Sequence, residues 1–108
     1  MERYGLIVID GVEHLSTIDL SIATYLRCLG FKLTAIPRYE KGNVMFFFSP
    51  TAEAQKALQD FLNDQALANP RAFNKARNEL KRMVNKAIRE ALFDLTLARK
   101  SNGGDSHE

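Results

Sequence analysis

The sequence predicts an α+β fold in which a small, largely antiparallel sheet is covered by helices, in the order β-α-β-β-α-α. Three observations predict it. Short runs rich in β-branched and aromatic residues occur at residues 4–10 and 31–48. Apolar residues recur at helical spacing in residues 17–29 and 54–62. A long basic segment with helical spacing then follows Asn69-Pro70, so the fold should end in a long basic helix.

The N-terminal third is expected to form one strand and one helix. Residues 4–10 are β-branched and close with an Asp-Gly turn signal, and residues 11–16 are expected to be a connection. Thr17 suits the N-cap of the helix. The apolar spacing extends to Leu29, and Gly30 is the residue type that ends a helix.

A β-hairpin is expected next. Residues 31–36 alternate between apolar and polar and end at Pro37, and the loop 38–43 contains Gly-Asn, a pair expected in hairpin connections. Residues 44–48 return as the second strand and are apolar on both faces. Such a strand is either central, with cover on both sides, or it exposes an aromatic surface to a partner.

Two helices are expected in the C-terminal half. Ser49-Pro50 supplies a cap followed by proline at the first helical position, and this helix should end near residues 63–64. Asn69-Pro70 repeats the signal, and the last helix should run to about Lys100. We therefore expect a single domain over residues 1–100 and a disordered tail over residues 101–108.

Composition excludes several classes of protein. Hydrophobic residues make up 45% of the 108 and charged residues 26%, which excludes disorder for most of the chain. No uncharged apolar run reaches the roughly 18–20 residues of a membrane span, and the N-terminus does not resemble a secretory signal. One cysteine, Cys28, cannot form an internal disulfide, so we expect a cytoplasmic protein.

Positive charge is concentrated in the last helix. Residues 1–69 hold six basic and eight acidic side chains, a net charge of −2, whereas residues 70–100 hold nine basic and three acidic ones, a net charge of +6. At 100° per residue, five of the basic residues fall within roughly 60° of one direction around the helix. Asparagines lie between them, and two further cations lie at one border of the group. We call these residues the basic face: Arg71, Lys75, Arg82, Lys86 and Arg89, flanked by Arg77 and Lys81.

The basic face has several interpretations, of which binding to nucleic acid is one and an ordinary solvated surface is another. Lysine and arginine on one side of a helix can contact several phosphates of a nucleic acid, DNA or RNA, without reading its sequence. Alternatively the face is simply solvated, as the polar sides of surface helices usually are, or it binds an acidic protein as an adaptor or inhibitor does, or it forms a joint in a larger assembly. Arg38, Tyr39 and Lys41, at the predicted hairpin tip, would be a secondary nucleic-acid contact.

Beyond Arg89, the last helix carries apolar residues on more sides than the one side that an amphipathic helix packs against its domain. Either the body of the domain buries this end or a second copy covers it, and we favour a homodimer because so short a domain has little core left to cover it. Asp94 and the shortness of the stretch argue against insertion into a membrane. The expected dimer interface is Leu92, Phe93, Leu95 and Leu97.

The sequence contains no catalytic, metal-binding or cofactor motif. His14 lies beside Glu13 in an expected surface loop, without the spacing of a metal site, and Cys28 has no matching histidine motif. No glycine-rich phosphate loop occurs. We therefore expect a binding module that is not an enzyme and that needs no metal or cofactor.

Several segments carry a family resemblance. They include the run from Ser16 to Leu26, the following Leu29-Gly30-Phe31, and Met45 to Phe48. Phe61-Leu62-Asn63, Pro70 to Phe73 and Ala76 to Lys81 complete the set. From about Ser16 to Lys86 the chain resembles a family of short phage and bacterial proteins, the domain of unknown function 5659. The resemblance implies an intracellular module borne by a phage or mobile element, and it transfers no catalytic residue.

Overall fold

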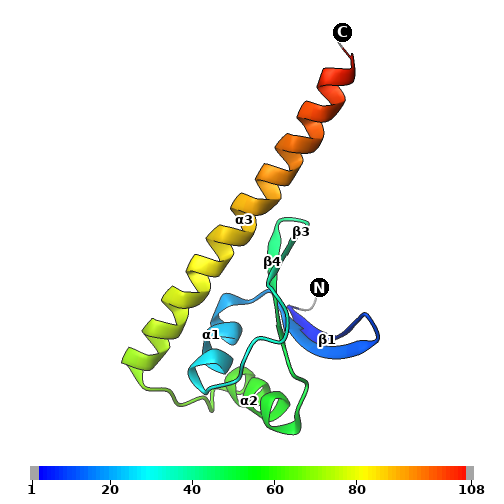
Figure 1. Ribbon diagram of the computed structural model, residues 1–108. Helices are drawn as coiled ribbons and strands as arrows, with labels where there is room; N and C mark the ends of the chain where they lie inside the picture. Colours follow the sequence, from blue (N-terminus) through cyan, green and yellow to red (C-terminus); the bar gives the residue numbers. More distant parts are fainter. Residues whose placement is uncertain (1–2, 107–108) are drawn as a thin grey trace.

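Four antiparallel strands pack against helices, and the last helix extends well beyond the rest of the chain (Figure 1). The computed structural model describes residues 3–106, with side chains described for residues 3–97. The sheet has the order β1-β2-β4-β3. Its strands are β1 (Tyr4–Ile9), β2 (Val12–Thr17), β3 (Arg38–Glu40) and β4 (Asn43–Phe48), and the helices are α1 (Leu20–Cys28), α2 (Ala52–Leu62) and α3 (Pro70–Ser106). The predicted α+β class and antiparallel sheet are confirmed.

The expected connection at residues 11–16 is instead strand β2. Asp10 and Gly11 both have positive φ, 51° and 80°, as a two-residue type I′ turn requires, so the chain returns at once along β1. Ser16 donates a hydrogen bond to the Gly5 carbonyl, and Thr17 donates one to the Arg3 carbonyl. The element order is therefore β-β-α-β-β-α-α, one strand more than predicted.

The N-cap of α1 is Asp19 and not Thr17. The Asp19 carboxylate accepts hydrogen bonds from the backbone N–H groups of Ser21 and Ile22, whereas Thr17 ends β2. The predicted C-terminus is close to the observed one, because the helix ends at Cys28 and Gly30 takes a φ of +100°.

The first strand of the predicted hairpin is displaced. In residues 31–36 only Leu33 bridges to β4, and β3 lies after Pro37, at Arg38–Glu40. The turn is Lys41-Gly42, with φ values of 52° and 85°, so Asn43 already belongs to β4. The alternation in residues 31–36 does not produce a strand, because the register that this turn sets pairs β4 with the residues after the proline.

Strand β4 is central and covered on both faces, as one of the two sequence interpretations expects. Phe46 and Phe48 lie in the core that the three helices cover. Phe47 points to the opposite face and is also fully buried. There it lies beneath His14, with ring centroids 5.9 Å apart, and the Arg38 guanidinium carbon is 5.8 Å from its centroid. The phenylalanines are therefore not available for stacking on bases.

Both remaining helices begin close to their predicted caps. Thr51, and not Ser49, caps α2 by accepting a hydrogen bond from the Ala54 N–H. Asn69 caps α3 as predicted, accepting from the N–H groups of Arg71 and Ala72. The helical backbone of α3 includes residues 101–106 of the predicted disordered tail; the side chains of residues 98–108 and the backbone of 107–108 lie outside the described part, and the tail stays a prediction.

Candidate nucleic-acid interface

One side of α3 fixes the helix to the domain. Leu80 is fully buried in the core to which α1 also contributes, and Ala76, one turn earlier on the same side of α3, is 7% exposed. The half-buried side chains on the same side of α3 extend this contact along about four turns: Phe73, Met83, Val84, Ala87 and Ile88. Because these residues are held against the body, the orientation of α3 about its own axis is set, and its opposite side faces water.

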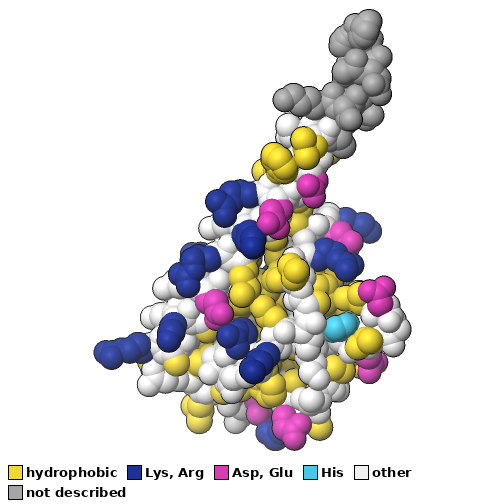
Figure 2. Space-filling view, in the orientation of Figure 1, with side chains coloured by type: hydrophobic (Ala, Val, Ile, Leu, Met, Phe, Trp, Pro, Cys, Tyr) yellow, Lys and Arg dark blue, Asp and Glu magenta, His cyan; other side chains and the backbone are white. Residues whose placement is uncertain are grey.

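The predicted basic face lies on that opposite side. All of its cationic residues are exposed: Arg71, Lys75, Arg77, Lys81, Arg82, Lys86 and Arg89. Figure 2 shows Lys and Arg side chains following the helix, with few acidic ones among them. From Arg71 to Arg89 the face is about 27 Å long at 1.5 Å per residue, and the helix is unbroken along it.

The charge of the basic face is not neutralised by the described part of its own chain. No carboxylate among the described side chains lies within 4.0 Å of a cation of the face. Glu79, which borders the face, instead pairs with Arg27 of α1, whose Nη2 lies 3.3 Å from the carboxylate. This pair engages one of the two glutamates at the border of the face, the other being the exposed Glu90, and it helps to join α3 to α1.

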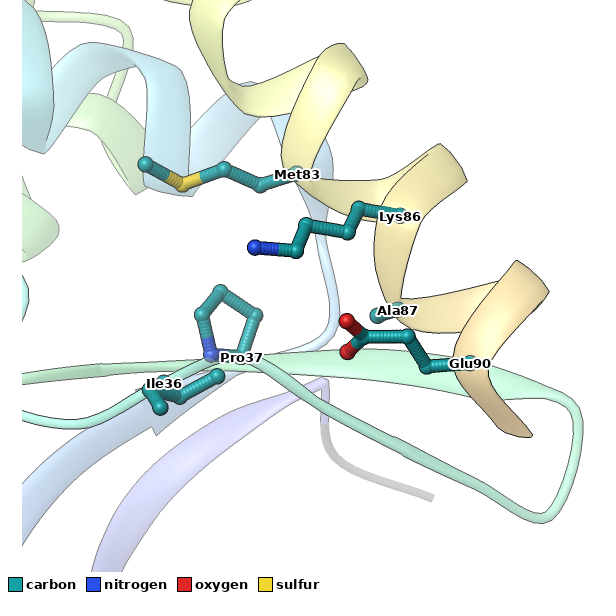
Figure 3. Close-up of a pocket in the computed structure, with 6 residues that line it drawn as sticks. All are labelled: Ile36, Pro37, Met83, Lys86, Ala87 and Glu90. Carbon is teal, nitrogen blue, oxygen red and sulfur yellow. The ribbon is translucent and has the colours of Figure 1, made fainter. Parts of the chain in front are cut away.

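Lys86 lies at the edge of the basic face, beside a pocket. The pocket has a volume of about 320 Å³ and lies between α3 and the segment that precedes β3. Figure 3 shows the Lys86 ammonium pointing across it toward Met83 and Pro37, and Glu90 on the next turn of the helix. The remaining lining residues, Ile36 and Ala87, are apolar. Spacing alone places Lys86 with the other cations, but its side chain extends toward the body.

The hairpin residues are arranged differently from the prediction. Arg38 and Tyr39 lie within β3, beside α3, and only Lys41 belongs to the turn. Arg38 lies over the Phe47 ring, and Tyr39 is 36% exposed. Hydrophobic side chains separate this hairpin from the cations of α3 in Figure 2. The hairpin is therefore a separate surface, and its contact with nucleic acid stays a prediction.

The apolar end of α3 extends beyond the body of the domain (Figure 1). Its large side chains are half or more exposed, so burial by the domain's own body, one of the two predicted explanations, is wrong. The exposed fractions are 54% for Leu92, 63% for Phe93, 53% for Leu95 and 50% for Leu97. An exposed apolar surface of this kind is typical of an interaction site.

His14 and Cys28, the residues considered above for metal binding or catalysis, both lie in regular secondary structure. His14 is not in a surface loop but in β2, 8% exposed, with its Nδ1 2.8 Å from the Thr34 hydroxyl. Cys28, at the end of α1, is half-buried. Among the described residues, no three His, Cys, Asp or Glu side chains lie close enough together to hold a metal ion.

Comparison with known proteins identifies one family. The model of the family described as Domain of unknown function (DUF5659) matches residues 13–86. The chain belongs to this family. The DUF5659 match begins within β2 and ends at Lys86, so it contains most of the basic face but neither β1 nor the apolar end of α3. No curated protein and no solved structure matches the chain. Within its described part, no helix is both long and apolar enough to cross a membrane.

Proposed function

We propose that this protein binds the phosphate backbone of nucleic acid, DNA or RNA, through the basic face of α3. The observation that carries the proposal is the set of exposed cations on one unbroken helix, none paired with a described carboxylate. Like charges repeated along a helix repel one another, and polyanion binding relieves that repulsion. Asn78 and Asn85, exposed among the cations, are further hydrogen-bond donors for phosphate oxygens.

Binding of this kind is electrostatic and independent of sequence. Lysine and arginine contacts to phosphate position a protein on nucleic acid but do not distinguish bases. Each phosphate neutralised releases condensed counterions, so affinity falls with salt in proportion to the number of contacts. Four or five engaged cations correspond to a log–log slope of about −3 to −5.

Fluorescence anisotropy with labelled single- and double-stranded oligonucleotides, titrated between low and moderate salt, tests the proposal. The double variant Lys75→Glu/Arg82→Glu should bind at least about tenfold more weakly, with a salt slope shallower by about 2, because each cation contributes about one contact. Lys56→Glu, on α2 and 76% exposed at its side chain, is the control for a charge reversal elsewhere. It should change the affinity less than about threefold.

Two results would overturn the proposal. One is a salt-independent affinity, and the other is an equal loss of affinity in the control and the double variant. If no oligonucleotide binds but a polyglutamate chain does, the basic face instead serves an acidic protein, as in an adaptor or inhibitor.

Further parts of the proposal concern setting and assembly. A nucleic-acid partner and a single unpaired cysteine fit a cytoplasmic protein, and the family resemblance fits a phage or mobile element. The exposed apolar end of α3 supports a homodimer.

A further inference from the structure

A second stripe runs along α3 beside the basic face. Met83, Lys86, Glu90, Phe93 and Leu97 follow one another at spacings of three and four residues, so they lie on one side of the helix. The stripe is apolar at both ends and charged in the middle. It begins against the body of the domain and ends on the part of α3 that extends beyond it (Figure 1).

The first half of this stripe lines the pocket in Figure 3. Met83, Ala87, Ile36 and Pro37 make the pocket apolar, and Ile36 is 85% exposed. Lys86 and Glu90 stand at its edge one helical turn apart, yet these two described side chains form no ion pair with each other. The pocket therefore offers an apolar floor with one positive and one negative group beside it.

The second half of the stripe carries a side chain that suits the pocket. Phe93 is 63% exposed, and a phenylalanine ring inserts well into an apolar pocket of this size. Phe93 does not line the pocket of its own chain; one helical turn beyond Glu90, it borders a separate hollow with Lys86, Arg89 and Glu90. A second copy can place its own Phe93 at the Met83 end of the pocket, about 15 Å along α3 from the Phe93 of this chain.

We propose that two copies of this chain pair antiparallel along this stripe, so that Phe93 of each copy fills the pocket beside Met83 of the other. A two-fold axis level with residue 88 makes the contacts reciprocal. It places Phe93 opposite Met83 and Lys86 opposite Glu90, twice each. A parallel two-fold pair would instead set Lys86 against Lys86 and Glu90 against Glu90, so the charges select the antiparallel arrangement.

The arrangement has a consequence for the basic face. We call the contact between the two stripes the seam. In an antiparallel two-fold pair, a side chain that flanks the seam on one side lies on the same side as its counterpart from the partner. Arg82 and Arg89 flank the seam on the side away from the body, so the two basic faces lie next to each other. Lys86 then belongs to the seam and leaves the basic face.

Of the four residues expected at the dimer interface, only Phe93 and Leu97 lie on the seam. At 100° per residue Leu92 and Leu95 fall on the far side of α3. This division provides a matched control, because Phe93 and Leu95 are both more than half exposed and neither contributes to the core.

Sedimentation equilibrium of the full chain, without nucleic acid and over a wide range of concentrations, tests the seam. Phe93→Ala should weaken dimerisation at least about tenfold, because a buried aromatic anchor is lost. Leu95→Ala should change it less than about twofold. Circular dichroism of each variant establishes that the fold is retained. A monomeric wild-type protein, or equal effects of the two substitutions, overturns the proposal.

Exchange of charges tests the register. Lys86→Glu and Glu90→Lys should each weaken the homodimer, because each places like charges opposite one another twice. An equimolar mixture of the two variants should form a heterodimer about as stable as the wild type, since every opposed pair is again of opposite sign. Failure to form the heterodimer overturns the antiparallel register. The assay contains no oligonucleotide, so its outcome is separate from that of the proposed function.

Discussion

Replacement of Leu80 by alanine tests how α3 is attached to the domain. Leu80 is fully buried and belongs to the core that α3 shares with α1 and the sheet. Truncation of a buried leucine costs about 3 kcal/mol, the sum of lost transfer free energy and the cavity that remains. For a domain whose total stability is of the order of 5–10 kcal/mol, that is a large fraction.

The measurement is urea unfolding followed by circular dichroism. With an m value of about 1.5 kcal/mol per molar urea, the loss lowers the midpoint by about 2 M. Leu97→Ala is the matched control, because Leu97 is 50% exposed and lies beyond the core, and it should change stability by less than about 0.5 kcal/mol. Both variants are compared in a Phe93→Ala background, so that dimerisation does not contribute to the measured stability.

A loss below about 1 kcal/mol for Leu80→Ala would contradict the attachment described above. Leu80 would then not be a core residue, and the orientation of α3 about its axis would be different. The exposure of the basic face depends on that orientation, so the same result would remove the support for nucleic-acid binding.

Four smaller perturbations follow from individual contacts and turn positions. Asp19→Ala removes the N-cap of α1 and should lower the free energy of unfolding, measured by thermal unfolding, by about 1 kcal/mol. Asp10→Gly replaces a residue at a positive φ by glycine, and it should leave that free energy unchanged or raise it slightly. Gly42→Val places a β-branched residue at a φ of +85° and should cost more than about 1 kcal/mol. Glu79→Gln breaks a partly exposed ion pair with Arg27 and should lower stability by less than about 1 kcal/mol. Oligonucleotide affinity should not decrease, because no cation of the basic face pairs with Glu79.

Local patterns predict the helices well. The cap at Asn69, the proline after it and the apolar spacing through Leu80 are all encoded within a few residues of one another, and α3 begins where they place it. The side of α3 that contacts the body follows from the same spacing. The positions of most basic residues were predicted for this reason.

Strand pairing is less evident from local patterns. Val12–Thr17 contains glutamate, histidine, serine and threonine, and reads as a connection, yet Ser16 and Thr17 are buried because β1 and β4 flank them. Residues 31–36 alternate like a strand but find only one bridge to β4. In both cases, the partner strand and not the local composition determines the structure.

The pocket at Lys86 could not be predicted from the pattern of α3. It exists because Ile36 and Pro37, some fifty residues earlier in the chain, lie beside the helix. Helical spacing assigns Lys86 to the group of cations, and only the packing of that preceding segment shows that its ammonium extends over an apolar floor.

Although α3 is one continuous helix, the part that packs on the domain and the part beyond Glu90 have different sources of stability. Amide hydrogens near Leu80 exchange with solvent only when the whole domain unfolds, since the core holds that part. Beyond Glu90 the helix has only its own hydrogen bonds, and an isolated helical segment of that length is marginal in water. Deuterium uptake should therefore rise sharply between these two points, and trypsin should cut first after Arg99 or Lys100, the sites that lie beyond Glu90.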